Sequence, residues 1–190
     1  MGLYSKEGYG AVTMRAIAQQ LGFSAPAIYN YFLSKEEIFS ALQEIGMELM
    51  ARRVLTPPTD DPLADLRSIF TLYYQFTKEQ PEYFTLLYVD PSTPRVSEQF
   101  PALVQMGVET DRRLRRCVEA GVLPPDTPGK VAGILWGIVH GPAVLRQVQG
   151  MSPATDFDAV ALVGLDLALA GIKAGLLPAE TQGDRIERLC

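Results

Sequence analysis

The side chains of this chain that are suited to chemistry are few, and they do not form a catalytic set. His140 is the only histidine, and no Cys, His or Asp cluster surrounds it in the sequence. Cys117 and Cys190 show neither metal-ligand spacing nor a disulfide framework. No G-x-S-x-G, H-E-x-x-H or phosphate-loop motif is present. We therefore expect no enzyme, no metal and no cofactor. We expect His140 to be hydrogen-bonded and partly buried, the alternative being that it lines a ligand cavity.

A second group of candidate residues is aromatic and lies between residues 70 and 88. Buried tyrosines need partners for their hydroxyl groups, so a tyrosine-rich interior favours a mostly apolar cavity with a few polar contacts. Ordinary core packing is the alternative. A downstream helical face, with Gln105 and Arg113, is placed to close such a cavity. The predicted effector-binding residues are Tyr73, Tyr74, Phe84, Tyr88, Met106, Glu109, Trp136 and His140.

The elements that must position these side chains are helices. Apolar residues recur at helical spacing almost throughout, and strand-like alternation is missing. The predicted helices cover residues 13–21, a short segment capped by Ser24, 34–53, 63–79, 82–89, 97–120, 128–149 and 156–177. Residues 56–62, rich in proline, predict a linker. The tail, 178–190, is polar and expected to fray. The fold class is therefore all-α.

Small residues form stripes on the last two predicted helices. Gly133, Gly137 and Gly141 are four residues apart, and the final helix carries a matching stripe of alanine and glycine. Glycine is costly inside a helix, so the stripes predict a close approach of these two helices. Their other faces are also apolar, which predicts a homodimer formed through them, because exposing them would cost solubility.

The distribution of charge along the chain is compatible with nucleic-acid binding but does not by itself indicate it. Residues 1–53 carry as many basic as acidic side chains, so the net charge of −5 falls on residues 54–190. Screening acts within about 10 Å, so a locally basic module on an acidic body can still bind DNA. Arg112–Arg116, a basic run, is expected on a solvated, salt-bridged face. No apolar run is long enough for a membrane span, and the N-terminus does not resemble a signal peptide. Two cysteines without a disulfide framework predict a reduced cytoplasmic protein with free thiols.

Three stretches near the N-terminus specify more than a helical hairpin. These are Gly8–Ala18, Leu21–Ser24 and Ile28–Ile38, taken in that order and spacing. Together they closely resemble the helix-turn-helix domain of the TetR family of bacterial transcription regulators. Trp136, His140 and Gly141 also resemble the Trp-x-x-x-His-Gly signature of one branch of the family's C-terminal domains. The resemblance implies a homodimeric DNA-binding regulator with a C-terminal domain that senses a small molecule.

The resemblance also implies roles for individual side chains. Thr13 sits where a hydroxyl and a helix N-terminus can meet a phosphate, and Arg15 one turn on can reach a phosphate or a base. Tyr29 and Lys35 match positions that contact the DNA backbone. The predicted DNA-binding residues are Thr13, Arg15, Ala25, Pro26, Ala27, Tyr29, Asn30, Tyr31 and Lys35. Ile28 and Phe32 are expected in the core.

Two features depart from the family pattern. Only Leu3–Glu7 precede the Gly8-Tyr9 motif, so the first helix is expected to be largely missing, the true start lying upstream or the chain being clipped. The reading helix has no Arg or Lys before Lys35. We expect a DNA-binding domain at residues 1–48 and a ligand-binding and dimerisation domain at 49–190. The predicted function is a repressor that binds an operator, a double-stranded DNA site, through the two helix-turn-helix domains of the dimer (the reading heads). A small, mostly apolar effector is expected to release it by altering the spacing of the two reading heads. The alternative is a dimeric small-molecule-binding bundle without DNA binding.

Overall fold

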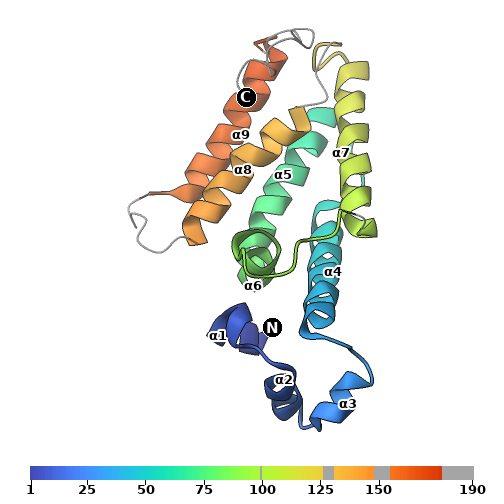
Figure 1. Ribbon diagram of the computed structural model, residues 1–190. Coiled ribbons are helices and arrows are strands. Elements are labelled where there is room, and N and C mark those ends of the chain that lie inside the picture. The colour runs from blue at the N-terminus through green and yellow to red at the C-terminus, as the bar shows by residue number, and fades with distance from the viewer. Residues whose placement is uncertain (99, 126–130, 148–154, 177–190) are drawn as a thin grey trace, which may run out of the picture. The chain divides into compact units, whose positions relative to one another are not determined.

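The computed structural model describes residues 1–98, 100–125, 131–147 and 155–176, and every regular element in these ranges is a helix. Figure 1 shows their order along the chain. The helices are α1 Gly2–Ala11, α2 Met14–Leu21, α3 Ala25–Tyr29, α4 Lys35–Val54, α5 Pro62–Glu79, α6 Pro81–Phe84, η1 Thr85–Val89, α7 Pro101–Glu119, α8 Val131–Gln147 and α9 Phe157–Lys173. The all-α prediction is confirmed. Both ends of the predicted 128–149 helix and the predicted frayed tail lie outside the described residues.

The ends of these helices follow local chemistry. Proline at the first position of α6 and α7 fits a helix start, because the missing N–H is one that the helix would leave unpaired. The α7 helix therefore begins at Pro101, four residues later than the sequence predicts. The segment Thr85–Val89 continues α6 as a π-helical turn, closed by a 3.0 Å bond from the Asp90 N–H to the Thr85 carbonyl.

The chain divides into two compact units. The first comprises residues 1–53 and 75–106, and the second comprises residues 54–74 and 107–190. The predicted domain boundary at residue 48 falls inside α4 and stays a prediction.

In the first unit, α1 and α4 share an apolar core. Tyr4 packs its ring edge-on against Phe39 at 5.5 Å between centroids, and Val12 and Leu86 are buried beside them. The Tyr4 hydroxyl donates to Asp90 at 3.2 Å. More of a first helix is therefore present than the sequence predicts, although Gly8, with φ of 74°, interrupts its helical geometry. Leu21 is 59% exposed.

In the second unit, α8 and α9 pack side by side (Figure 1). The buried faces carry Leu135 and Val139 on α8, and Leu165 and Leu169 on α9. The contact between the two helices is closest at Gly164, where an added Cβ would lie 3.2 Å from the Ile138 side chain. One prediction is wrong here: an added Cβ at Gly133, Gly137 or Gly141 would meet no atom within 4 Å. The glycine stripe of α8 therefore faces open space instead of α9.

Candidate DNA interface and effector site

The segment α2–turn–α3 forms a helix-turn-helix whose two helices are capped as the sequence predicts. The Thr13 hydroxyl accepts the Ala16 N–H at 3.1 Å, and the Ser24 hydroxyl accepts the Ala27 N–H at 3.3 Å. Gly22 ends α2 in the left-handed conformation, with φ of 72°, which a glycine adopts without steric cost. These caps fix the turn between the two helices.

A small core holds the two helices against each other. Met14, Ala18 and Ile28 are buried together, and Phe32 and Ile38 pack partly buried against them. The core role predicted for Ile28 is therefore confirmed, and Phe32 belongs to the same cluster at its edge. The core is built from one face of each helix, which leaves the other faces free.

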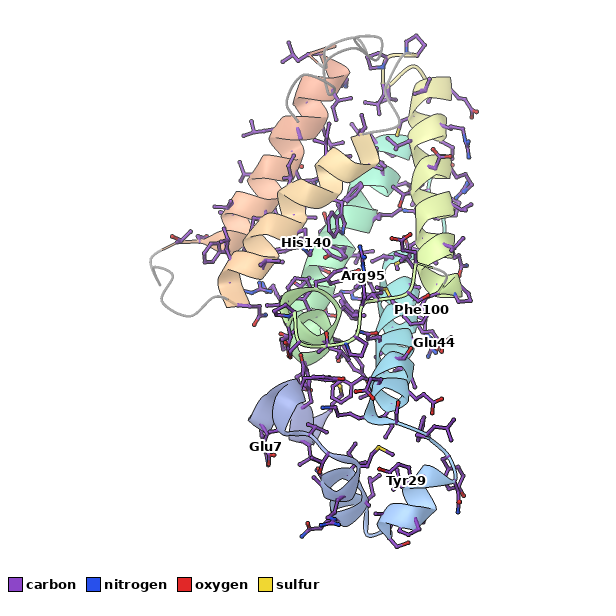
Figure 2. All side chains as sticks on the ribbon, viewed as in Figure 1. Glu7, Tyr29, Glu44, Arg95, Phe100 and His140 are labelled. Atoms are coloured by element: carbon purple, nitrogen blue, oxygen red, sulfur yellow. The ribbon has the colours of Figure 1, made fainter. Side chains whose placement is uncertain are left out.

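The opposite faces carry the predicted DNA-binding side chains. Exposed among them are Thr13, Arg15, Pro26, Tyr29, Asn30 and Tyr31. Ala25, Ala27 and Lys35 are intermediate. Tyr29 on α3 is 50% exposed (Figure 2), and Tyr31, beyond the end of that helix, is 81% exposed. Their roles toward DNA stay predictions, but their accessibility is what such roles require.

Lys35 is held by a partner that the candidate set omitted. Its Nζ donates to the Tyr9 carbonyl at 3.1 Å and lies 3.9 Å from the centroid of the Tyr9 ring. The Tyr9 hydroxyl in turn donates to Glu36 at 2.9 Å. Burial and the Glu36 carboxylate raise the pKa of Tyr9. Tyr9 thus positions Lys35 at the start of α4. Its place in the Gly8-Tyr9 motif was the only signal for it in the sequence.

The start of α4 is a capping box shifted by one residue. The Ser34 hydroxyl accepts the Glu37 N–H at 3.3 Å. The Glu37 carboxylate reaches back to the Leu33 N–H at 2.6 Å, one residue before the cap. Because both ends of the short Leu33–Glu37 segment are bonded, the direction of the chain into α4 is fixed.

In the second unit, three predicted effector residues meet. The Tyr73 hydroxyl lies 2.6 Å from His140 Nδ1, and the Trp136 ring stacks on the imidazole at 4.1 Å between centroids. Tyr73 is buried, His140 (Figure 2) is intermediate, and Trp136 is 38% exposed. Burial lowers the pKa of His140, so the neutral imidazole is favoured. The prediction of a hydrogen-bonded, partly buried histidine is confirmed.

Tyr74 and Glu109 make contacts within the protein. The Tyr74 hydroxyl donates to Asp158 at 2.9 Å and accepts from Arg146 at 3.3 Å, which joins α5 to α9 and α8. Glu109 pairs with both Arg112 and Arg113, at 2.7 and 2.8 Å, and these partners lower its pKa to about 2. Both side chains are therefore already bound within the second unit.

The remaining predicted effector residues belong to the first unit. The rings of Phe84 and Tyr88 lie 5.7 Å apart, and the Tyr88 hydroxyl is 4.0 Å from the Met47 sulfur. Burial raises the pKa of Tyr88 to about 12. Met106, at the end of that unit, is intermediate in exposure. A single cavity lined by all eight predicted residues stays a prediction.

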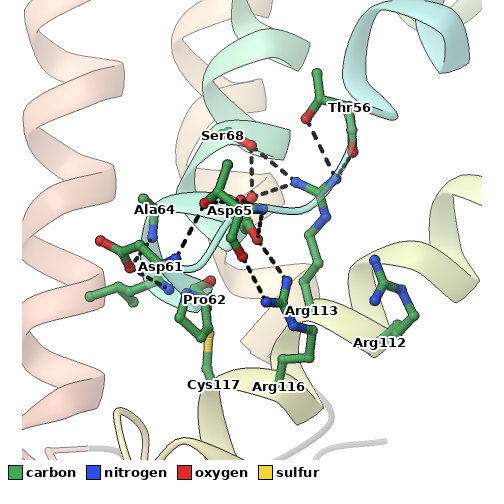
Figure 3. A network of polar contacts seen from close by, with 12 residues as sticks. Thr56, Asp61, Pro62, Ala64, Asp65, Ser68, Arg112, Arg113, Arg116 and Cys117 are labelled. Atoms are coloured by element: carbon green, nitrogen blue, oxygen red, sulfur yellow. Dashed lines mark hydrogen bonds and ion pairs between the residues drawn. The ribbon is translucent and has the colours of Figure 1, made fainter.

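The strongest polar network of the second unit surrounds an arginine expected to be solvated. Arg113 is fully buried, which contradicts that expectation, because its guanidinium supplies donors to the connector between α4 and α5. It donates to the Thr56 carbonyl at 2.5 Å, the Asp65 carbonyl at 2.7 Å and the Ser68 hydroxyl at 3.1 Å (Figure 3).

Asp65 completes this network from the other side. Its carboxylate accepts the Thr59 N–H at 2.9 Å and pairs with Arg116 at 2.7 Å. These donors together lower the pKa of Asp65 despite its burial, which acts in the opposite direction. The connector that the sequence assigns to a linker is therefore fastened to α5 and α7. Nothing in the spacing of Asp65 and Arg113 signalled this contact.

The exposed faces of α8 and α9 are strongly apolar. Ile134 and Leu145 on α8 are each 42% exposed. On α9, Val160, Val163 and Leu167 are 51%, 54% and 69% exposed. Together with the open glycine stripe of α8, these residues form what we term the α8–α9 face.

The described part of the chain also bears on metal binding and membrane insertion. Over these residues, no three metal-binding side chains come together. Nor does any helix there combine the length and the hydrophobicity needed to cross a membrane.

Two family models match the chain. The model described as "Bacterial regulatory proteins, tetR family" matches residues 1–42, and "Tetracyclin repressor-like, C-terminal domain" matches residues 66–167. Among curated proteins, the nucleoid occlusion factor SlmA of Vibrio vulnificus is 32% identical over 81 residues. That alignment covers 42% of this chain and 41% of the relative, so the chain spans about two fifths of the relative's length.

Solved structures share the fold at low identity. A protein of unknown function from Rhodococcus sp. RHA1 superposes with a TM-score of 0.74 at 21% identity, covering 90% of each chain. The TetR family regulator PfmR of Thermus thermophilus gives 0.65 at 22% identity, with 90% of this chain and 94% of that one covered. The TetR-family repressor FadR, also of Thermus thermophilus and in complex with lauroyl-CoA, gives 0.58 at 22% identity, with 97% and 94% covered.

Proposed function

Since the chain belongs to the TetR family of bacterial regulatory proteins, we propose that it is a transcription regulator that binds operator DNA and responds to a small molecule. The family assignment also accounts for the missing catalytic motifs, because the regulators of this family are not enzymes. The finer assignment, to the branch with the Trp-x-x-x-His-Gly signature, stays a prediction. We place the protein in the cytoplasm, where its DNA is.

The observation that carries the DNA-binding function is the capped helix-turn-helix with an accessible outer face. Thr13 and Arg15 at the start of α2 are exposed, where hydroxyl and guanidinium groups can contact phosphates. The small side chains Ala25 and Ala27 let α3 approach the bases closely, and their methyl groups suit thymine. Because α3 carries no cation, affinity depends on these short contacts and on two reading heads binding together.

Fluorescence anisotropy with the DNA upstream of the gene tests this function. We expect salt-dependent binding, with log affinity falling linearly with log salt concentration, because phosphate contacts release counterions. A scrambled duplex of equal length is the control. Equal binding to both duplexes would remove the operator function, and binding to neither would leave the alternative, a small-molecule-binding bundle without DNA binding.

We propose that the protein is a repressor released by a mostly apolar effector. The support is the aromatic character of the candidate residues: Tyr73, His140 and Trp136 in one unit, Phe84 and Tyr88 in the other. FadR, which shares the fold, is described as a repressor in complex with lauroyl-CoA, a ligand with a long apolar chain. Release of the bound operator on adding apolar compounds supports this role, and tighter operator binding contradicts it.

The homodimer is proposed to form through the α8–α9 face. Exposed valine and leucine side chains on α9 and the open glycine stripe of α8 support this, because a large uncovered apolar surface favours association. Analytical ultracentrifugation of Leu167→Glu should show monomers where the unmodified chain sediments as a dimer. Leu176→Glu, at a residue 76% exposed beyond the end of α9, is the matched control and should remain dimeric.

A further inference from the structure

The side-chain amide of Gln43, on α4, is hydrogen-bonded through its nitrogen but not through its oxygen. The side chain is 1% exposed, and its Nε2 donates to the Pro94 carbonyl at 2.6 Å. That bond fixes the orientation of the amide, because a carbonyl accepts only from the nitrogen. Over the described residues, no donor of the chain lies within hydrogen-bond distance of the buried Oε1.

An unbonded acceptor at this depth is unusual. Buried side-chain polar atoms nearly always have a partner, since leaving one unpaired forfeits its hydration without replacement. A hydrophobic residue would fill the position at no such cost, and the bond to Pro94 uses the nitrogen alone. The oxygen is therefore the part of Gln43 that its contacts within the protein do not explain.

The side chains of the first unit that helix spacing and side-chain contacts link to Gln43 through Met47 are apolar. Met47, one helical turn along α4, lies on the same face as Gln43. Its sulfur is 4.0 Å from the Tyr88 hydroxyl, and Tyr88 packs against Phe84. A methionine side chain is flexible and readily moves aside for another apolar group. Phe84 and Tyr88 are the two residues of this unit's aromatic segment that the sequence assigns to the effector site.

We propose that Gln43 Oε1 accepts a hydrogen bond from the effector, which is a largely apolar molecule with one neutral donor, a hydroxyl or an N–H. This inference rests on the proposed effector-sensing function and names the ligand class for it. We take the donor as neutral because the side chains linked to Gln43 through Met47, namely Phe84 and Tyr88, carry no charge. Such a site discriminates between ligands, because only a ligand with the donor supplies Oε1 with a hydrogen bond.

Matched pairs of ligands that differ only in the donor test this proposal. The probes are 4-octylphenol with 4-octylanisole, and dodecan-1-ol with 1-methoxydodecane, titrated by calorimetry into the full chain. We expect the member with the hydroxyl to bind about tenfold more tightly, the effect of one buried hydrogen bond. Gln43→Met, similar in size, should bind both members of a pair alike. Gln43→Leu is the second variant, and thermal melting checks that each is folded.

The control variant is Gln19→Leu, at an exposed glutamine of α2, which should keep the preference of the unmodified chain. A purely structural role for Gln43, as an anchor for Pro94, would lower the melting temperature without changing the ratio within a pair. Equal affinity for both members in the unmodified chain overturns the proposal, as does a preference that survives in Gln43→Met.

Two further outcomes separate this proposal from the proposed function. A donor preference that depends on Gln43, without release of bound operator, keeps the ligand class and overturns the repressor mechanism. Operator binding with no affinity for any of the four probes overturns the ligand class proposed here and leaves the DNA-binding function standing.

Discussion

The second unit and the helix-turn-helix of the first unit use their cationic side chains in opposite ways. In the second unit, Arg113 is fully buried, Arg116 pairs with Asp65, and Arg67 pairs with Asp166 at 2.6 Å. In the helix-turn-helix of the first unit, Arg15 is exposed, and Lys35 lies against Tyr9. Cations in the second unit therefore hold its helices together, whereas those of the reading head are few and serve its surface.

The difference shows that the number of charged residues says little about function until the position and partners of each charged side chain are known. The run Arg112–Arg116 is the most basic stretch of the chain, yet Arg113 within it supports the α4–α5 connector. The reading head has no comparable run and depends on hydroxyl groups, small side chains and helix caps.

The largest expected effect is a loss of stability when the buried Arg113 is replaced. Arg113→Met should lower the free energy of unfolding by about 3 kcal/mol, because the carbonyls of Thr56 and Asp65 lose their donors and Glu109 loses a partner. Urea unfolding measures it. Arg115→Met removes a solvent-exposed pair with Asp111 and should cost less than about 0.5 kcal/mol. Similar losses in the two variants would show that burial does not set the contribution of Arg113 to stability.

The next effect is on DNA binding. Arg15→Ala should weaken operator binding about tenfold and reduce the slope of log affinity against log salt by about 1, since one phosphate contact is lost. Anisotropy titrations at several salt concentrations measure both. Arg115→Ala removes an accessible cation from the second unit and should leave the slope unchanged. If both variants shift the slope, cations outside the reading head also contact DNA.

A smaller effect is expected at the cap of α2. Thr13→Ala removes the acceptor for the Ala16 N–H and should cost about 1 kcal/mol of stability. Thr13→Ser keeps the hydroxyl and should recover most of that loss. Urea unfolding with paired anisotropy measurements shows whether the hydroxyl serves the fold alone. A Thr13→Ser variant as unstable as Thr13→Ala would assign the loss to the methyl group.

The smallest effect is a pH dependence of the second unit. The folded state lowers the pKa of His140 below its ordinary value of 6.5, so below pH 6.5 the unfolded chain takes up the proton first. Stability should therefore fall as the pH drops below 6.5 and stop falling below the lowered pKa. Thermal melts of the unmodified chain and His140→Gln at pH 8 and pH 5.5 measure the difference. An equal pH response in both would assign it to other groups.

Local patterns were sufficient to predict the helices and the reading head. Thr13, Ser24 and Gly22 each act on neighbouring backbone groups, so their roles depend only on nearby sequence. The same holds for the helical periodicity that predicts the helices and for the order of motifs that identifies the family.

Tertiary structure alone decided which polar side chains are paired and which faces are covered. The hydrogen bond from Arg113 to Thr56 spans 57 residues, and the one from Gln43 to Pro94 spans 51. Neither can therefore be predicted from the spacing of neighbouring residues. The glycine stripe of α8 predicted a close contact with α9 that the structure does not show, because several faces of that helix are apolar and periodicity cannot rank them. By itself, then, the sequence determined the helices and the family of this protein. The packing of distant segments determined where its buried charges and its unbonded acceptor lie.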